Sequence, residues 1–288
     1  MRRILITGGK GMLATDLTAQ FTAAGRYEVF PLSRDDLDVR DAAGVDEAVV
    51  GLKADVVIHT AALHVDRCEE HPADAYHVNA WGTRTLARVC EQRGAILVYI
   101  STCGLFGDEH KAYTEYDPVV LKTVYARSKY EGEVFVRQFC GRHFIVRPGW
   151  LFGGSPEHAK NFVFRRYEEA RKSSVIRSVF DKHGSPTYTA DLAGGIAGLL
   201  ETDEYGTYHV TNGGGCSRAA YVRHILRCFG LSIEVEEVDS SHYPRRANVP
   251  DCEVLENLNL RFAGRDALPP WEEAVARYIR LIHGETKA

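Results

Sequence analysis

The chain has 288 residues, of which 45% are hydrophobic and 26% charged, an ordinary composition for a globular protein of one large domain, or one large and one small domain. Its 35 basic and 39 acidic side chains give a formal charge of -4, which creates no long-range field that would gather nucleic acid or anionic lipid. We therefore expect neither nucleic acid nor a membrane as a partner.

The first apolar run, residues 4–6, ends at Thr7-Gly8, too early for the hydrophobic region of a secretory signal. No later run approaches the roughly 20 apolar residues that cross a bilayer. The seven cysteines are scattered without a C-x-x-C pair, and the twelve histidines show no H-E-x-x-H spacing. These features predict a cytoplasmic protein with reduced thiols and no metal site.

Short β-branched runs alternate with longer amphipathic stretches along the first half of the chain. The runs predicted as strands are residues 4–7, 27–32, 55–59, 95–100 and 143–146. The stretches long enough for crossover helices are residues 12–24, 73–91 and 124–140. This alternation predicts an α/β fold with a doubly wound parallel sheet of the Rossmann type, whose ligands bind beyond the carboxyl ends of the strands.

The pattern changes after Arg147-Pro148-Gly149. A Gly-Gly-Ser-Pro turn at 153–156 is followed by a basic helix near 161–172 and by short elements in loops rich in Gly and Pro. We interpret residues 1–150 as a dinucleotide-binding domain and residues 151–288 mainly as a smaller, substrate-binding lobe, with later segments returning to the first domain.

A glycine-rich turn joins the first predicted strand to the first predicted helix. In the string Thr7-Gly8-Gly9-Lys10-Gly11-Met12-Leu13-Ala14, glycine lets the backbone approach a pyrophosphate that rests on helix N–H groups. Small residues in a tight turn indicate a pyrophosphate site only when they occur together with the alternating β/α pattern, because any tight turn needs small residues. The residues expected to bind the cofactor here are Gly8, Lys10, Gly11, Met12 and Leu13.

The end of the second predicted strand distinguishes the two dinucleotides. An acidic residue there hydrogen-bonds the ribose of NAD, whereas a basic residue binds the additional phosphate of NADP. This chain has Ser33 and Arg34, followed by two aspartates, so NADP(H) is preferred and NAD(H) remains possible. A solvated surface arginine is the alternative interpretation of Arg34. Asp38 and Val39 are expected to lie along the adenine.

The third predicted strand ends in His59-Thr60-Ala61-Ala62. Small residues at this point let a flat cofactor lie against the backbone, so Thr60, Ala61 and Ala62 are expected in the cofactor site. His59 and His64 are candidates for acid–base chemistry, but a histidine at a strand end is more often hydrogen-bonded scaffold. We expect His64 on the substrate side.

Ser101-Thr102 ends the fourth predicted strand, and Tyr125 precedes Lys129 by four residues on one face of a predicted helix. A tyrosine with a pKa of about 10 relays protons poorly at neutral pH, and a neighbouring ammonium is expected to lower that pKa. Tyr125 would donate a proton to a carbonyl oxygen that Thr102 also holds, while Lys129 also reaches the nicotinamide ribose. We predict Thr102, Tyr125 and Lys129 as catalytic residues, with Ser101, Tyr125 and Lys129 also at the cofactor.

With these motifs the chain resembles the extended short-chain dehydrogenases/reductases, and among them the dTDP-4-dehydrorhamnose reductase family, over nearly its whole length. Further similar stretches are Val65-Asp66-Arg67-Cys68-Glu69, Val78-Asn79-Ala80, Arg147-Pro148-Gly149-Trp150-Leu151-Phe152-Gly153, Gly184-Ser185-Pro186-Thr187-Tyr188 and Gly206-Thr207-Tyr208-His209-Val210-Thr211-Asn212. The resemblance implies reduction of a C4 ketone on a nucleotide-linked 6-deoxysugar by the three predicted catalytic residues. It also implies that Asn79 lies beside the cofactor and that Trp150 and the smaller lobe contact the substrate.

Two departures from the family pattern concern the substrate side. After the Ser-Thr pair the family typically has Asp-Tyr-Val, whereas this chain has Cys103 and Gly104 followed by leucine, so contacts made there are expected to differ. In the stretch from Tyr243 to Pro250, the family usually has an arginine immediately before the final proline, where this chain has Val249. Basic charge lies instead at Arg245 and Arg246, whose guanidinium forks are expected to clamp a diphosphate.

The expected function is therefore an NADPH-dependent ketoreductase acting on a nucleotide sugar, with a homodimer as one possible assembly. An epimerase or dehydratase that retains NAD is an alternative. Such enzymes usually have an acidic residue at the position of Ser33 and additional acid–base groups beside Thr102. A non-catalytic, NADP-binding regulatory subunit is another alternative, because the same superfamily branch includes one for methionine adenosyltransferase. Such a subunit would be free to lose the Tyr125 and Lys129 pair.

Overall fold

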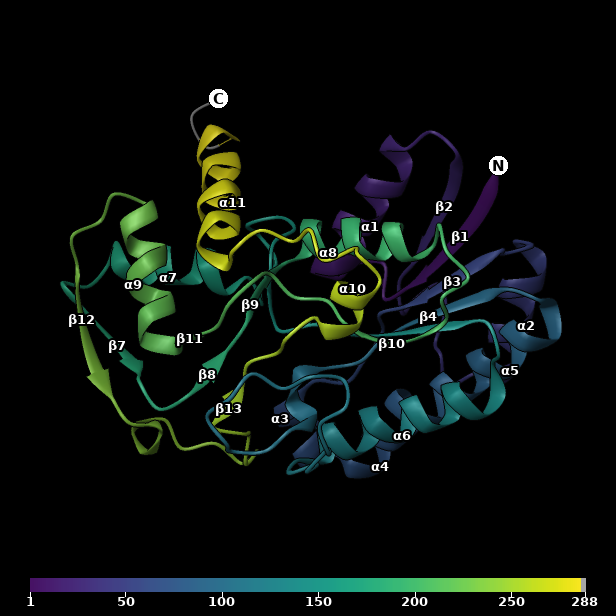
Figure 1. Cartoon of the computed structure of the whole chain (residues 1–288), viewed down its shortest axis with the longest axis horizontal. Helices are drawn as coiled ribbons and strands as arrows, with labels where there is room; N and C mark the ends of the chain where they lie inside the picture. The colour runs from purple at the N-terminus through teal and green to yellow at the C-terminus, as the bar shows by residue number, and fades with distance from the viewer. Residues whose placement is uncertain (286–288) are drawn as a thin grey trace.

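A six-stranded sheet forms the centre of one half of the molecule, with every strand parallel, in the order β10-β5-β4-β3-β1-β2 (Figure 1). Its strands are β1 (Arg2–Thr7), β2 (Tyr27–Leu32), β3 (Val56–His59), β4 (Ile96–Ile100), β5 (His143–Arg147) and β10 (Gly206–His209). The computed structural model describes residues 1–285. The predicted doubly wound parallel sheet is confirmed, and each of the five predicted strands ends within two residues of its expected bounds. The sixth strand, β10, has no counterpart among them.

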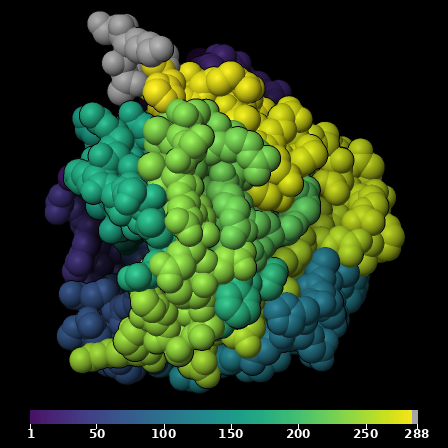
Figure 2. Space-filling view, turned by 90° about the vertical axis from the view of Figure 1, so that its left-hand side faces the viewer, coloured from purple at the N-terminus to yellow at the C-terminus, as the bar shows by residue number. Residues whose placement is uncertain are grey.

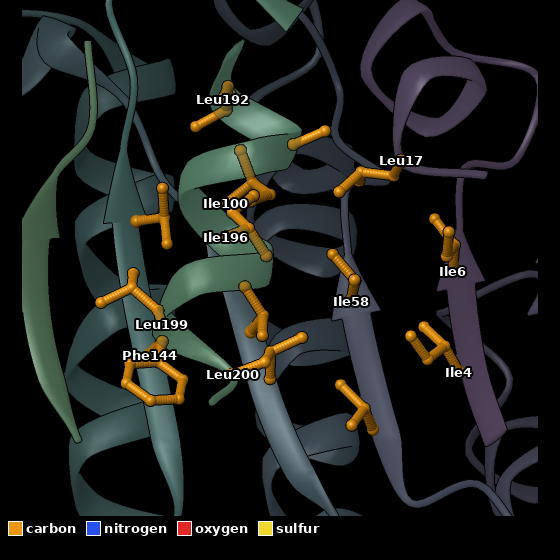
Figure 3. Packing of buried hydrophobic residues seen from close by; sticks show 14 of the residues in the cluster. Ile4, Ile6, Leu17, Ile58, Ile100, Phe144, Leu192, Ile196, Leu199 and Leu200 are labelled. Atoms are coloured by element: carbon orange, nitrogen blue, oxygen red, sulfur yellow. The ribbon is translucent and has the colours of Figure 1, made fainter. Parts of the chain in front are cut away.

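Successive residues of each central strand are buried on opposite faces of the sheet. In β1, Ile4 and Ile6 pack into one hydrophobic cluster and Leu5 into the other. Two helices, α1 (Met12–Ala23) and α8 (Thr189–Leu199), cover the first face, where Figure 3 shows side chains of α8 over β3, β4 and β5. The other face is covered by α2 (Ala42–Gly51), α5 (Thr83–Arg93) and α6 (Val124–Phe139). Helix α2 was not predicted, whereas α1 and α6 each end one residue before their expected bound.

The single helix expected over residues 73–91 is interrupted. The chain forms α4 (Pro72–Tyr76), a π-helical segment η1 (His77–Gly82) and then α5. Helix α6 packs closely against η1, because a Cβ added at Gly132 would lie 2.3 Å from the Tyr99 hydroxyl and 2.7 Å from the Asn79 carbonyl oxygen. Only glycine permits this approach without displacing its neighbours, so Gly132 fixes the distance between α6 and the sheet.

Most of the second half of the chain forms a separate lobe (Figure 1). Its helices and strands are β6 (Trp150–Phe152), α7 (Phe162–Ala170), β7 (Val175–Val179), β8 (His183–Gly184), β9 (Pro186–Tyr188), β11 (Cys216–Ser217), α9 (Arg218–Cys228), β12 (Glu234–Val238), β13 (Cys252–Glu253) and α11 (Trp271–Glu285). Figure 2 views the molecule from the end that this lobe forms, with light green segments across the centre of the face. Because α8 and β10 return to the sheet, this lobe is not one continuous stretch of the chain.

The remaining short elements are α3 (Val65–Glu70), η2 (Cys103–Leu105), η3 (Ser240–His242) and α10 (Leu258–Phe262). None of the helices within residues 1–285 combines the length and the apolar composition that a bilayer crossing requires. In the same residues no three His, Cys, Asp or Glu side chains gather as a group that could hold a metal ion.

Candidate functional site

The turn between β1 and α1 is built by glycines. Gly8 has a φ of +70°, and a Cβ there would lie 2.9 Å from the Thr60 hydroxyl oxygen, so the turn can pack against the end of β3 only with glycine. The N-cap residue of α1, Gly11, offers no side-chain acceptor, so no side chain caps the first turn of the helix. An uncapped helix start beside a cavity suits an anion such as a pyrophosphate.

A cavity of about 620 Å³ lies at the carboxyl ends of β1, β3 and β4, a volume in the usual range for cofactor sites. Residues predicted for the cofactor or for catalysis supply most of its lining: Gly8, Lys10, Gly11, Met12, Leu13, Arg34, Asp38, Val39, Thr60, Ala61, Ala62, Ser101, Thr102, Tyr125 and Lys129. The uncapped helix start and this elongated set of small and polar residues fit a dinucleotide.

The end of β2 contributes Arg34 but not Ser33 to the cavity. Ser33 is buried and donates its hydroxyl to Asp36, with the two oxygens 2.6 Å apart. The Arg34 side chain is exposed, and its nearest acid partner is Asp38, with 3.7 Å between nitrogen and oxygen. Hydrogen bonds from Arg40 bind Asp38 more closely and lower its pKa to about 2. Arg34 is thus only loosely engaged and is accessible to a ligand.

The two residues predicted on one face of α6 both reach the cavity. Lys129 is buried, and its ammonium donates to the Ile100 carbonyl oxygen at 2.7 Å and lies 4.1 Å from the centre of the Tyr99 ring. Tyr125 lies beside Thr102, which accepts a hydrogen bond from the Gly104 N–H at 3.1 Å. The end of β4 and the start of α6 therefore bring a hydroxyl, a phenol and an ammonium to one place.

The expected lowering of the Tyr125 pKa is wrong for the free protein. Burial raises the pKa of Tyr125, and the hydrogen bond with Thr102 offsets this only in part. Burial also lowers the pKa of Lys129, to about 7. The spacing predicted the positions of the two residues correctly, but burial and not the neighbouring ammonium decides the direction of the Tyr125 pKa shift. Tyr125 consequently keeps its proton at neutral pH.

The buried Lys129 predicts a specific pH dependence of stability. A lysine in the unfolded chain titrates near pH 10.4, whereas the pKa of Lys129 in the folded protein is about 7. Between these values the unfolded chain binds a proton that the folded chain does not, so the free energy of unfolding should increase as the pH rises above about 7. Urea titrations at about pH 7, 8 and 9 should show a smaller rise for Lys129→Met than for the unaltered protein. Equal slopes for the two proteins would contradict this assignment.

Beneath this cluster a buried ion pair fixes α6 to the sheet. Glu133 on α6 is fully buried and accepts two hydrogen bonds from Arg147 at the end of β5, at 2.8 and 2.7 Å. The Ser101 hydroxyl donates to the same carboxylate at 2.6 Å. The Arg147 guanidinium and these hydrogen bonds hold the pKa of Glu133 below its usual value despite burial. The pair thereby sets the position of β4 relative to the helix that bears Tyr125 and Lys129.

A second cavity, of about 540 Å³, opens between the sheet and the smaller lobe. Thr102 and Tyr125 line both cavities, and four of the residues predicted for the substrate also line the second: Cys103, Trp150, Arg245 and Arg246. Gly104 lies next to it. The Glu253 carboxylate comes within 3.1 Å of the point where a Cβ at Gly104 would stand, and it accepts a hydrogen bond from the Trp150 indole at 2.7 Å. The absent side chain at Gly104 leaves room for this carboxylate.

Two polar residues predicted to contact a ligand, His64 and Asn79, do not lie where they were expected, whereas His59 does. His64 lines the first cavity rather than the second, and burial lowers its pKa to about 4, so it is neutral. Asn79 is fully buried and lines neither cavity. Its side-chain amide accepts a hydrogen bond from the Leu63 N–H and donates one to the Leu63 carbonyl oxygen, and Leu63 lines the first cavity. His59 is buried between the hydroxyls of Thr7 and Thr83, as expected of scaffold.

Sequence reasoning did not identify four charged residues that line the cavities. Lys160 reaches the first cavity from the smaller lobe, while Lys182, Arg218 and Glu253 line the second. Ser217 precedes an apolar periodic stretch and is recognisable as an N-cap, so the sequence predicts that α9 begins at Arg218. No local pattern, however, indicates which face of a distant lobe turns toward the sheet.

Known proteins resemble this chain in both sequence and fold. The family model described as RmlD substrate binding domain matches residues 1–283. The dTDP-4-dehydrorhamnose reductase of Streptomyces griseus is 36% identical over 292 residues, covering 98% of this chain and 94% of that protein. The crystal structure of the dTDP-4-dehydrorhamnose reductase from Clostridium acetobutylicum has a TM-score of 0.93 at 34% identity and covers 98% of this chain and 99% of its own. The dTDP-4-dehydrorhamnose reductase from Bacillus anthracis, solved in complex with NADP, has a TM-score of 0.92 at 34% identity. The match covers 96% of this chain and 99% of that one. The predicted resemblance is confirmed, and the chain belongs to the RmlD substrate binding domain family.

Proposed function

We propose that this chain is an NADPH-dependent reductase of the 4-keto group of a nucleotide-linked deoxysugar, as its relatives named dTDP-4-dehydrorhamnose reductase suggest. One observation carries the proposal: Thr102 and Tyr125 line both the cavity that fits a dinucleotide and the cavity on the lobe side. A carbonyl held by these two hydroxyls would lie at the junction, where a group in the first cavity can reach its carbon.

The residues of the chain then have distinct chemical roles. Thr102 and Tyr125 hydrogen-bond the carbonyl oxygen, and Tyr125 transfers its proton to that oxygen as negative charge develops there. NADPH, when bound, supplies the hydride. The raised pKa of Tyr125 keeps the donor protonated until transfer, and the Lys129 ammonium stabilises the phenolate that remains. Lys129 also lies where it can bind the ribose hydroxyls of the cofactor.

Arg34 is the proposed contact for the additional phosphate of NADPH, because it lines the cavity at the end of β2 and has only a loose acid partner. Arg34→Ala should weaken NADPH binding by about tenfold to a hundredfold and leave NADH binding nearly unchanged, since only NADPH bears that phosphate. Fluorescence titration with both cofactors measures the preference. Arg88→Ala, which alters an exposed arginine outside the cavity, is the matched control. An unaltered preference in Arg34→Ala would refute the assignment.

The overall activity is tested by mixing the protein with NADPH and freshly prepared 4-keto-6-deoxy nucleotide sugars and following the absorbance at about 340 nm, which the reduced nicotinamide alone gives. We expect the absorbance to fall with at least one of these substrates. No turnover with thymidine, uridine or guanosine diphosphate sugars would count against a reductase. A cytoplasmic homodimer stays part of the proposal, and sedimentation of the purified protein tests the assembly.

A further inference from the structure

The guanidinium of Arg218 lies over two aromatic rings at the second cavity. Its central carbon lies 3.4 Å from the centre of the Trp150 ring and 4.8 Å from that of Phe162. Arg218 lines the same cavity as Thr102 and Tyr125. Stacking engages the faces of a guanidinium but leaves its N–H groups, which lie in the plane, available to an acceptor.

Arg218 lacks the acid partner that the other basic residues of this cavity have. Lys182 pairs with Asp251 at 2.5 Å, Arg245 with Asp66 at 3.0 Å, and Arg246 approaches Glu70 at 4.0 Å. Among residues 1–285, no side-chain hydrogen bond or ion pair engages the Arg218 guanidinium. Burial lowers the pKa of Arg218, and the negative charge of Glu253 nearby offsets this lowering only in part.

Glu253 interacts with Arg218 through its charge but forms no direct ion pair with it, although both contact Trp150. The carboxylate accepts the indole N–H at the edge of the ring, at 2.7 Å, whereas the guanidinium lies over its face. The Glu253 carboxylate lies beside Gly104 and Thr102, whereas Arg218 lies over the face of the Trp150 ring. An anion bound at Arg218 would lie beside Trp150, within the cavity that Thr102 and Tyr125 also line.

We propose that Arg218 binds the diphosphate of the nucleotide sugar, in place of the clamp expected from Arg245 and Arg246; this role rests on the proposed function. In a pyranose the diphosphate is attached to C1, across the ring from C4. A sugar whose C4 carbonyl meets Thr102 and Tyr125 extends its diphosphate away from them, toward the opposite part of the cavity. A guanidinium already held against an aromatic ring presents its donors to phosphate oxygens with little loss of side-chain entropy.

Binding of thymidine, uridine and guanosine diphosphates, measured by calorimetry without any turnover, tests this role. For the nucleoside diphosphate that the unaltered protein binds best, Arg218→Met should weaken binding by about tenfold to a hundredfold, because a charge-assisted contact is lost while the side chain keeps most of its bulk. Arg218→Lys should recover part of the affinity. Arg245→Met, which removes a cation already paired with Asp66, is the matched control and should change the affinity by less than about threefold.

NADPH binding by each variant reports whether the fold and the first cavity are intact. If Arg218→Met binds both NADPH and the diphosphate as the unaltered protein does, the inference is wrong. If Arg245→Met loses diphosphate affinity instead, the expected clamp at Arg245 is correct and the inference is likewise wrong. Failure of the unaltered protein to bind any nucleoside diphosphate would instead contradict the proposed function itself.

Discussion

Replacing Tyr125 with phenylalanine is expected to reduce turnover by about a hundredfold or more, since general acid catalysis of this kind contributes about 10²- to 10⁴-fold. The substitution removes the hydroxyl that donates a proton to the carbonyl oxygen and leaves the ring, which lines both cavities. NADPH affinity should therefore remain within a few-fold of its original value. Steady-state rates at saturating NADPH, together with a cofactor titration, measure the two quantities separately.

The matched control for this variant is Tyr130→Phe. Tyr130 lies on the same helix as Tyr125, but it lines neither cavity. We expect Tyr130→Phe to retain the turnover of the unaltered protein. Undiminished turnover in Tyr125→Phe would show that another group protonates the carbonyl oxygen, and the assignment of Tyr125 would then be wrong.

Removal of the Glu133 carboxylate should cost about 3 to 5 kcal/mol of stability, the range observed when one partner of a buried ion pair is lost. Glu133→Ala leaves the buried Arg147 guanidinium without its two hydrogen bonds and Ser101 without its acceptor. The helix bearing Tyr125 and Lys129 also loses its ion pair with Arg147 at the end of β5. Urea unfolding followed by circular dichroism measures the loss as a lower midpoint.

An exposed ion pair provides the control for Glu133→Ala. Glu236 accepts a hydrogen bond from Arg177 at 2.8 Å, with both side chains about half exposed, so Glu236→Ala should cost only about 0 to 1 kcal/mol. A double variant, Glu133→Leu with Arg147→Met, should recover part of the stability that Glu133→Ala loses, because no buried charge then remains unpaired. If Glu133→Ala and Glu236→Ala unfold at the same urea concentration, the buried pair does not have the structural role assigned to it.

The features predicted correctly from the sequence depend on local patterns. Buried parallel strands are short β-branched runs, and each of those predicted is present in the sheet. The turn at Gly8 needs a positive φ and close contact with Thr60, requirements that restrict the residue type strongly enough to be visible in one sequence. The four-residue spacing of Tyr125 and Lys129 likewise fixes their common helical face.

The features missed depend on contacts between distant segments. Glu253 reaches Trp150 from β13, and Arg218 reaches it from the start of α9. The packing of the smaller lobe sets the place of both elements, and no sequence periodicity indicates that packing. The pKa of Tyr125 followed burial, which the spacing to Lys129 could not reveal. Asn79 was placed at the cofactor by resemblance, whereas it is enclosed where the π-helical segment meets α6.

The most direct test of the account is the fate of the hydride in a single turnover. With NADPH deuterated at the transferring position, mass spectrometry of the sugar should find one deuterium at the former carbonyl carbon, with one oxidised cofactor released for each product formed. Transfer of the label would agree with a carbonyl lying between the two cavities at Thr102 and Tyr125. A sugar that is epimerised or dehydrated while the cofactor stays reduced and bound, or a sugar left unchanged, would contradict it.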